Sequence, residues 1–260
     1  MLKNLVEITK KTKLWTSRPH SMSGSAVWNI ATVTIALLVA IPIFTVISNI
    51  FVPSGDIWGH LASTVLPLYI MNSFWLMIGV GTGVFLIGVG TAWLVTMCSF
   101  PGSKQFQWLL ILPMAVPAYL LAYTYTDFLA FTGPVQDTLR TITGWGYGEY
   151  WFPDIRSLWG AILLMSLVFF PYVYLLTRAA FLEQSASLLE ASRSLGASSA
   201  KSFFKIALPL ARPSIAAGMA LALMETLNDF GTVDYFGVQT FTTGIYRTWF
   251  GLGERVAAAQ

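Results

Sequence analysis

The sequence predicts an all-α protein, a polytopic bundle of helices that cross a membrane. Of its 260 residues, 55% are hydrophobic and only 10% are charged, whereas soluble domains carry about 25% charged residues. So few charges do not cover a water-facing surface, which makes lipid the solvent for most of the chain. A second observation agrees: five segments reach the roughly 20 mostly apolar residues that a spanning helix needs.

The first two expected spans are Ala26–Val52 and Asn72–Cys98. The first follows a basic arm and carries no charge. The second is rich in small residues, with Gly79 and Gly83 four positions apart, a spacing that lets helices approach closely. We therefore expect the second span to pack inside the bundle.

The remaining three expected spans are Phe106–Phe131, Ser157–Thr177 and Leu210–Leu227. Prolines occur inside them, as at Pro117 and Pro171. Spans tolerate proline because neighbouring helices and waters satisfy the freed backbone groups, so we still expect one continuous helix for each segment.

Lysine and arginine are distributed unevenly over the loops, and this asymmetry predicts the orientation. Eleven of the fifteen lie in the N-terminal arm, in the loop after the second span or in the loop 178–212. The other side carries Arg140, Arg156, Arg247 and Arg255. Because cytoplasmic loops carry the excess, we expect the N-terminus and the loop 178–212 in the cytoplasm, and we interpret the basic arm as a topology signal without a nucleic-acid partner.

The expected organisation has three parts. Residues 1–25 form the basic cytoplasmic arm, residues 26–58 the first transmembrane helix, and residues 63–260 a core domain with a cytoplasmic loop at 183–209. The last six residues turn apolar just before the sequence stops. We interpret them as the start of a sixth span, which predicts that the core is incomplete and that the sequence is a fragment of a longer protein.

The sequence argues against several other classes of protein. One cysteine and two distant histidines leave no disulfide framework and no cysteine or histidine metal cluster. His-Glu-x-x-His, Gly-x-Ser-x-Gly and a phosphate-binding Gly-Lys-Ser/Thr are all missing. We therefore expect no enzyme, no cofactor and no ATP hydrolysis by this chain. An ion-coupled secondary transporter is the alternative, although it needs coupling charges at the midplane, where the spans lack a clear carboxylate.

The cytoplasmic loop between the fourth and fifth spans is the most informative segment. Ser187 is followed three residues later by Glu190, a capping-box pattern that starts a helix. On that helix Leu188, Leu189 and Leu195 form an apolar face. The loop thus begins with a short amphipathic helix at the membrane surface.

A turn and a second helix are expected to follow. Gly196 tolerates backbone angles that other residues resist, so the chain can reverse there. A second short helix is expected through Phe203 and Ile206 before Pro209 opens the fifth span. The result is a helix–turn–helix hairpin within residues 183–209, which we call the coupling segment.

The spacing of the coupling segment resembles the EAA loop of binding-protein-dependent importer permeases. That pattern has Glu-Ala-Ala, then Gly, then Ile-x-Leu-Pro at fixed intervals. One position departs, because a serine stands where the third residue is usually alanine. The matching positions are Glu190, Ala191, Ser192, Gly196, Ile206, Leu208 and Pro209.

Two further stretches, 225–238 and 240–247, resemble the ferric-iron branch of these permeases. The similarity extends over residues 70–260. It implies the type I importer permease fold, which is methionine-permease-like, with five complete spans and the start of a sixth. In that branch one polypeptide usually carries two fused halves, so this chain resembles most of the first half.

The resemblance also implies partners and a location in the bacterial inner (plasma) membrane. In the family, the loop docks in a groove on a separate ATPase dimer, a periplasmic substrate-binding protein delivers cargo, and a second permease half completes the pathway. ATP binding rocks the spans as rigid bodies. Glu190, Gly196 and the leucine face would carry the coupling through a helix-in-groove contact. No resident metal is implied, because the binding protein holds the iron.

Three acidic residues are candidates for the translocation pathway. Glu225 and Asp229 lie at the outer end of the fifth span, and Asp127 near the end of the third. Acidic residues in or near spans usually face a bundle interior or cavity, where they favour a cationic cargo. The alternative is that the first two pair with Arg247 or Arg255. Ferric iron rests on the resemblance alone, and sulfate, polyamines, thiamine and phosphonates stay open.

Overall fold

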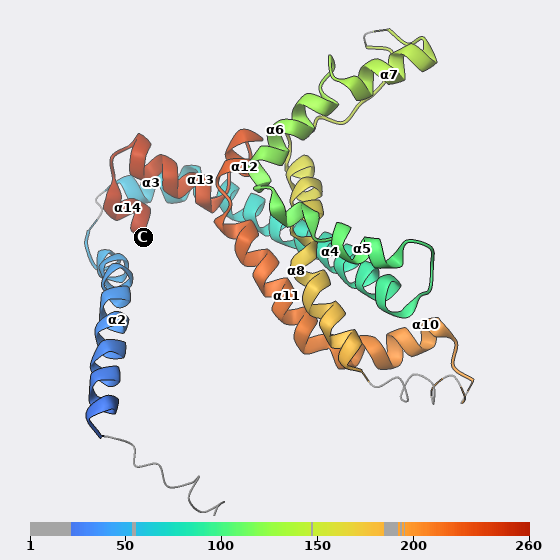
Figure 1. Ribbon diagram of the computed structural model, residues 1–260. Coiled ribbons are helices and arrows are strands. Elements are labelled where there is room, and N and C mark those ends of the chain that lie inside the picture. Colours follow the sequence, from blue (N-terminus) through green and yellow to red (C-terminus); the bar gives the residue numbers. More distant parts are fainter. Residues whose placement is uncertain (1–21, 54–55, 147, 185–191, 193, 195) are drawn as a thin grey trace, which may run out of the picture. The chain divides into compact units, whose positions relative to one another are not determined.

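The structure, a computed structural model, describes residues 22–53, 56–146, 148–184, 192, 194 and 196–260. Within these residues every regular element is a helix, as expected (Figure 1). The chain divides into two compact units, one up to Ser54 together with Ala259–Gln260, the other Gly55–Ala258. Each unit is described by itself.

The first unit is built on α2 (Met22–Asn49), which confirms the first expected span. Its apolar residues surround the whole helix, and none of the span is buried within the protein. A helix that is hydrophobic on all sides belongs in lipid. The hydroxyls of Thr32 and Thr45 donate hydrogen bonds to the carbonyls of Trp28 and Ile41 at 2.8 and 2.9 Å. These hydroxyls are therefore satisfied without water.

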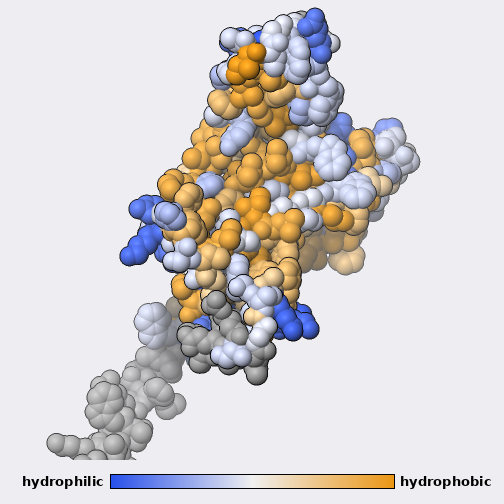
Figure 2. Space-filling view, turned by 90° about the vertical axis from the view of Figure 1, so that its right-hand side faces the viewer, coloured by the Kyte–Doolittle hydropathy of each residue, from blue (hydrophilic) through white to orange (hydrophobic). Residues whose placement is uncertain are grey.

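The core of the second unit is a three-helix bundle. Helices α4 (Leu66–Met97), α8 (Leu158–Glu183) and α11 (Leu208–Asn228) pack against one another (Figure 1). They confirm the second, fourth and fifth expected spans, and all three are longer than expected. Figure 2 shows that apolar side chains dominate the middle of the face in view, while the most hydrophilic ones lie around its margin. A large apolar surface of this kind suits contact with lipid.

Glycines bring the three helices into close contact. A Cβ built on Gly88 of α4 would lie 2.7 Å from the Cβ of Val173, and one built on Gly218 of α11 would lie 2.8 Å from the Cα of the same residue. Gly79 and Gly83 also face α8, which confirms the expected packing role of that pair. The helix α8 is therefore held between two glycine-lined faces.

The prediction of one continuous helix at Phe106–Phe131 is wrong. The chain bends by 97° between Ser103–Ala115 and Ala118–Thr143. Pro117 causes the break: its ring disfavours helical angles in the preceding residue, and Val116 is extended, with φ −117° and ψ 127°. The pieces are α5 (Ser103–Leu109), the 3₁₀ turn η1 (Leu112–Ala115), α6 (Ala118–Leu129) and α7 (Pro134–Thr143).

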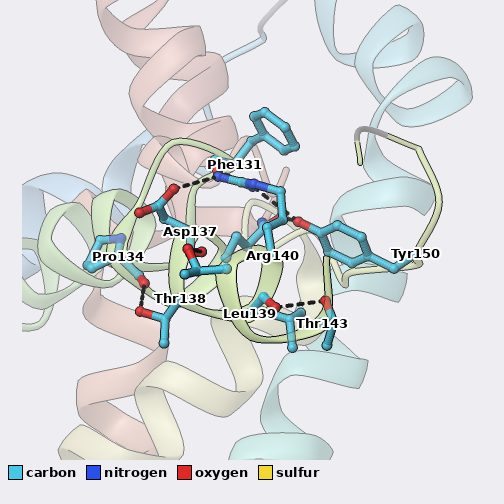
Figure 3. Close-up of polar contacts among 10 residues, drawn as sticks. Phe131, Pro134, Asp137, Thr138, Leu139, Arg140, Thr143 and Tyr150 are labelled. Atoms are coloured by element: carbon cyan, nitrogen blue, oxygen red, sulfur yellow. Dashed lines mark hydrogen bonds and ion pairs between the residues drawn. The ribbon is translucent and has the colours of Figure 1, made fainter. Parts of the chain in front are cut away.

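Beyond α6 the chain projects from the bundle as an arm that carries α7 (Figure 1). Arg140 organises this arm (Figure 3). Its guanidinium donates to the Phe131 carbonyl at 2.8 Å and to the Tyr150 hydroxyl at 3.2 Å, lies 3.3 Å from Asp137, and covers the Phe131 ring. One side chain thus holds together the loops on both sides of α7.

The remaining helices are short. They are α3 (Asp56–Thr64), α12 (Gly231–Tyr235), α13 (Phe241–Tyr246), the π turn η3 (Arg247–Gly251) and α14 (Arg255–Ala259). The last of these covers the residues that we interpret as the start of a sixth span, and that interpretation stays a prediction.

Candidate functional site

The coupling segment is described in part. Residues 185–191, 193 and 195 lie outside the described residues, so the predictions for Leu188, Leu189, Glu190, Ala191 and Leu195 are not tested by the structure. The described part includes Ser192, the turn at Gly196 and the whole second half.

The expected turn at Gly196 is confirmed. Its φ is +82°, in the left-handed region that glycine adopts without a steric penalty. The N–H of Ala197 donates to the carbonyl of Ser192 at 3.1 Å. A left-handed glycine followed by this bond is the Schellman pattern that ends helices, so the chain reverses here by a standard helix stop.

The second half of the coupling segment is continuous with the fifth span. It begins at α10 (Ser199–Ser202), where the hydroxyl of Ser198 accepts a bond from the N–H of Lys201. It then passes through the π turn η2 (Phe203–Ala207) into α11. We expected a separate short helix here, and the structure instead has one helical run, Ser199–Asn228.

The π turn explains how this run includes Pro209. Proline has no N–H and its ring presses on the carbonyl one turn earlier. In the wider turn the N–H of Leu208 bonds to the carbonyl of Phe203, five residues back. Such bulges loosen the ladder locally and occur often at functional sites. Ile206 lies in this turn, half-buried.

Two side-chain hydrogen bonds connect the parts of the coupling segment. The hydroxyls of Ser192 and Ser202 share a bond of 2.8 Å in a buried position. The Nε2 of Gln184, just past the end of α8, donates to the carbonyl of Ala207 at 3.0 Å. The second half is therefore bonded both to the first half and to α8.

A cavity of about 340 Å³ lies where η1, α6, α8 and the end of α11 meet. Two of the three acidic candidates line it. It contains no lysine, arginine or histidine, so its fixed charge is negative. Its polar and aromatic lining residues are Tyr119, Phe169, Tyr172, Glu225, Asn228, Asp229 and Phe230.

The two cavity carboxylates differ in their surroundings. Asp229, the first residue after the span, accepts the N–H of Thr232 at 2.8 Å and its hydroxyl at 3.1 Å. Burial raises the pKa of the Asp229 carboxyl, and the bonds from Thr232 oppose that rise. Glu225 is half-buried and forms no hydrogen bond or ion pair with any described residue. Glu225 is thus the carboxylate free to meet a ligand.

The alternative, in which Arg247 pairs with Glu225 or Asp229, is not found among the described residues. Arg247 lies 4.0 Å from Asp234. Asp127 is exposed on α6 and does not line the cavity, so the structure does not bring it to the other two, and its pathway role stays a prediction. The described residues hold no group of three metal-ligating side chains.

The sequence analysis missed Tyr172 and Asn228 as lining residues. Asn228 lies one turn after Glu225 on the same helix, and this spacing could have found it. Nothing in the sequence singles out Tyr172, because its position depends on how α8 meets α6 and α11.

The fold and these features define a polytopic membrane protein in which one long helix carries the turn at Gly196 near one end and the acidic cavity at the other. Residues 84–250 match the family described as "Binding-protein-dependent transport system inner membrane component". The chain belongs to this family, and the resemblance inferred from the coupling segment is confirmed.

Curated relatives carry different cargo names. The chain is 29% identical to the Fe(3+)-transport system permease protein FbpB 2 of Haemophilus influenzae over 68% of its length and 31% of the relative's. It is 30% identical to the molybdenum transport system permease protein ModB of Escherichia coli K12, over 57% of its own length and 62% of ModB. The identity to the sulfate transport system permease protein CysT of Synechococcus elongatus is 28%, over 79% of this chain and 72% of CysT.

Coverage of these relatives is incomplete. The chain spans about a third of FbpB 2 and about three fifths of ModB. Among solved structures, a chain of a bacterial alginate ABC transporter, in complex with its alginate pentasaccharide-bound periplasmic protein, superimposes with a TM-score of 0.70 at 18% identity. The superposition covers 94% of this chain and 90% of the alginate transporter chain. The polytopic permease fold is thereby established.

Proposed function

We propose that the chain is a transmembrane permease subunit of an ATP-driven importer in the bacterial inner membrane. A separate ATPase dimer would hydrolyse ATP, and a periplasmic substrate-binding protein would supply cargo. The observation that carries the proposal is the described part of the coupling segment, which turns at Gly196 and continues into a span, in a member of this family. The chain has no nucleotide-binding motif of its own, which fits a subunit that is not an enzyme.

The geometry supplies a path for the coupling. Ser199–Asn228 is one helical run of 30 residues, about 45 Å long at the usual rise. One end bears the hairpin, and Glu225 lies near the other. This run lies close to the backbone of α8 at Gly218, where an added Cβ would lie 2.8 Å from the Cα of Val173. A displacement of the hairpin would therefore tilt this helix against α8 and change the width of the cavity, as rigid-body closure does in other switching proteins.

Topology and assembly form the next part of the proposal. We place the N-terminus and the coupling segment in the cytoplasm, because most lysines and arginines lie on that side. The α7 arm and the coupling segment lie toward opposite ends of the second unit (Figure 1), which is consistent with this orientation. A second permease half, fused or separate, would complete the pathway, and the small share of FbpB 2 that the chain spans supports a fused one.

For the cargo we propose a cation, and ferric iron in particular. Glu225 and Asp229 line the cavity without a cationic side chain beside them, and like charges repel an anion such as sulfate. A relative named for Fe(3+) transport supports iron. Relatives named for sulfate and molybdenum point the other way. Polyamines and thiamine are cations too, so a direct comparison of cargoes is needed.

The test uses the full-length protein reconstituted in vesicles with its ATPase and binding protein. Uptake of radiolabelled Fe(III), sulfate, molybdate and a polyamine is compared with and without ATP. We expect ATP-dependent uptake of Fe(III), and uptake of sulfate or molybdate in its place would contradict the cation assignment. Absence of ATP-dependent uptake of any of them, together with no stimulation of the ATPase by the binding protein, would refute the importer itself.

Coupling is tested separately. Glu190→Ala and Gly196→Pro should uncouple ATP hydrolysis from uptake while leaving membrane insertion unchanged. Gly144→Pro is the matched control, because Gly144 also has a positive φ, +73°, but ends α7 on the arm. If both coupling-segment variants transport as the wild type does, the segment has no coupling role.

A further inference from the structure

We infer that Ser192 and Ser202, the serine pair, are positioning residues that hold the two halves of the coupling segment in the geometry that transmits motion to α11. This inference rests on the proposed function. It concerns two buried residues that do not line the cavity. Their effect is exerted through the helix that continues to the cavity.

The serine pair is buried and crosses the turn. The two hydroxyl oxygens are 2.8 Å apart, and the residues are only 6% and 4% exposed. One precedes Gly196 and the other belongs to α10, so their bond joins segments that the turn would otherwise leave free to separate. A buried hydroxyl without a partner is costly, so each serine depends on the other.

The departure from the family pattern acquires a reason here. Ser192 stands where the EAA pattern usually has alanine, so packing alone does not require its hydroxyl. Ser202 supplies the requirement, because its buried hydroxyl would lose its partner if residue 192 were alanine. Ser192→Ala alone is therefore expected to weaken the coupling segment, although alanine fits the space.

The serine pair completes a set of bonds that makes the coupling segment move with the span. Ser202 lies in the helical run Ser199–Asn228, and Gln184 bonds the same run to the end of α8. Without the serine bond, the hydrogen bond between described residues that remains across the turn is the one from the N–H of Ala197 to the carbonyl of Ser192. An ATPase that moves the first half would then rotate it about that turn without tilting α11, and ATP would be hydrolysed without transport.

The experiment compares Ser192→Ala, Ser202→Ala and the double variant in the full-length protein, reconstituted with its ATPase and binding protein. Ser194→Ala and Ser199→Ala are matched controls, because both serines are exposed on the same segment. Two quantities are measured: the stimulation of ATP hydrolysis by the binding protein, and hydrogen exchange of the backbone amides in residues 196–207. The KM for ATP is recorded alongside.

Each single variant should lower the stimulation ratio and speed up the exchange, both by roughly five-fold, as loss of one buried hydrogen bond predicts. The KM for ATP should not change, because ATP binds to the other subunit. The double variant should be no more impaired than either single variant, since all three lose the same bond. Such non-additivity identifies a direct interaction between the two sites, and the controls should match the wild type.

Three outcomes would overturn the inference. Single variants that equal the controls in both measurements would show that the bond holds nothing. Faster exchange with unchanged stimulation would leave the serine pair a stability role only. A double variant as impaired as the product of the two singles would deny the pairing. A wild-type protein whose ATPase is not stimulated at all refutes the proposed function instead, and the exchange data still report whether the bond forms.

Discussion

The close approach of α8 and α11 at Gly218 makes a quantitative prediction possible. A Cβ at this position would lie 2.8 Å from the Cα of Val173 and 3.0 Å from the Tyr172 carbonyl oxygen, where ordinary contact begins at 3.4 Å. Both atoms belong to the backbone of α8, so no side-chain rotation relieves the clash. In Gly218→Ala the two helices must separate by about 0.6 Å over this contact.

The energetic effect has two opposing parts. Overpacking of a tight core costs about 1–3 kcal/mol, and a backbone obstacle puts Gly218→Ala at the upper end. Replacing glycine by alanine inside a helix returns about 1 kcal/mol. Gly90→Ala on α4 is the matched control, because nothing lies within 4 Å of its Cβ position and only the favourable part applies. The two variants should therefore differ in free energy of unfolding by about 3 kcal/mol.

The assay is thermal unfolding of the full-length protein in detergent, followed by far-ultraviolet circular dichroism and size-exclusion chromatography. A difference of about 3 kcal/mol corresponds to about 6–12 °C in Tm for a domain of this size. Because Gly218 is also the contact about which α11 is proposed to tilt, Gly218→Ala should reduce the stimulation of the ATPase as well. Equal Tm values for Gly218→Ala and Gly90→Ala would refute the close approach and with it the tilting mechanism.

Three further predictions concern the cavity and the α7 arm. Glu225→Gln should slow Fe(III) uptake about five-fold or more, since even in water two unit charges 4 Å apart interact by about 1 kcal/mol. Asp234→Asn, which lies outside the cavity, should not slow uptake. Equal uptake rates in the two variants would remove Glu225 from the pathway. Asp229→Ala should lower the free energy of unfolding by about 1 kcal/mol, as loss of the hydrogen bonds from Thr232 predicts, and an unchanged Tm would show that these bonds do not stabilise the fold. Arg140→Gln should speed up proteolysis of the α7 arm, whereas Asp137→Asn, whose side chain is 71% exposed, should have little effect; identical digestion of both would show that Arg140 does not hold the arm.

Hydropathy identified four spans correctly because length and apolar composition alone decide whether a helix can cross a bilayer. The same reasoning failed at residues 106–131, where it treated proline as tolerated. Proline is tolerated at Pro42 in α2 and Pro171 in α8, so its presence does not predict a break. Pro113 and Pro117 come four residues apart, and the second forces Val116 into an extended conformation. The outcome depends on what packs around the freed groups, which composition does not encode.

The acidic residues show the same division between local and tertiary information. The bonds between Asp229 and Thr232 could have been expected from the sequence, because aspartate side chains often accept bonds from backbone N–H groups a few residues away. Its place in the cavity with Glu225 follows from one helix, since the two are four residues apart. Asp127 was selected on the same grounds of charge and span position, yet it is exposed. Which face of α6 meets α8 depends on the bend at Pro117, and that bend was missed.

The single helical run Ser199–Asn228 connects the second half of the coupling segment to the cavity, so under the proposed mechanism the two candidate sites would move as one unit. Had the second half of the coupling segment been a separate helix, as the sequence suggested, a flexible joint at Pro209 would absorb the movement of the hairpin. The π turn at Phe203–Ala207 keeps the helix unbroken while it includes a proline, and Gln184 ties that turn to α8. A proline that would ordinarily interrupt the connection is thus accommodated where continuity is needed, and the contact at Gly218 is left as the point about which α11 can tilt.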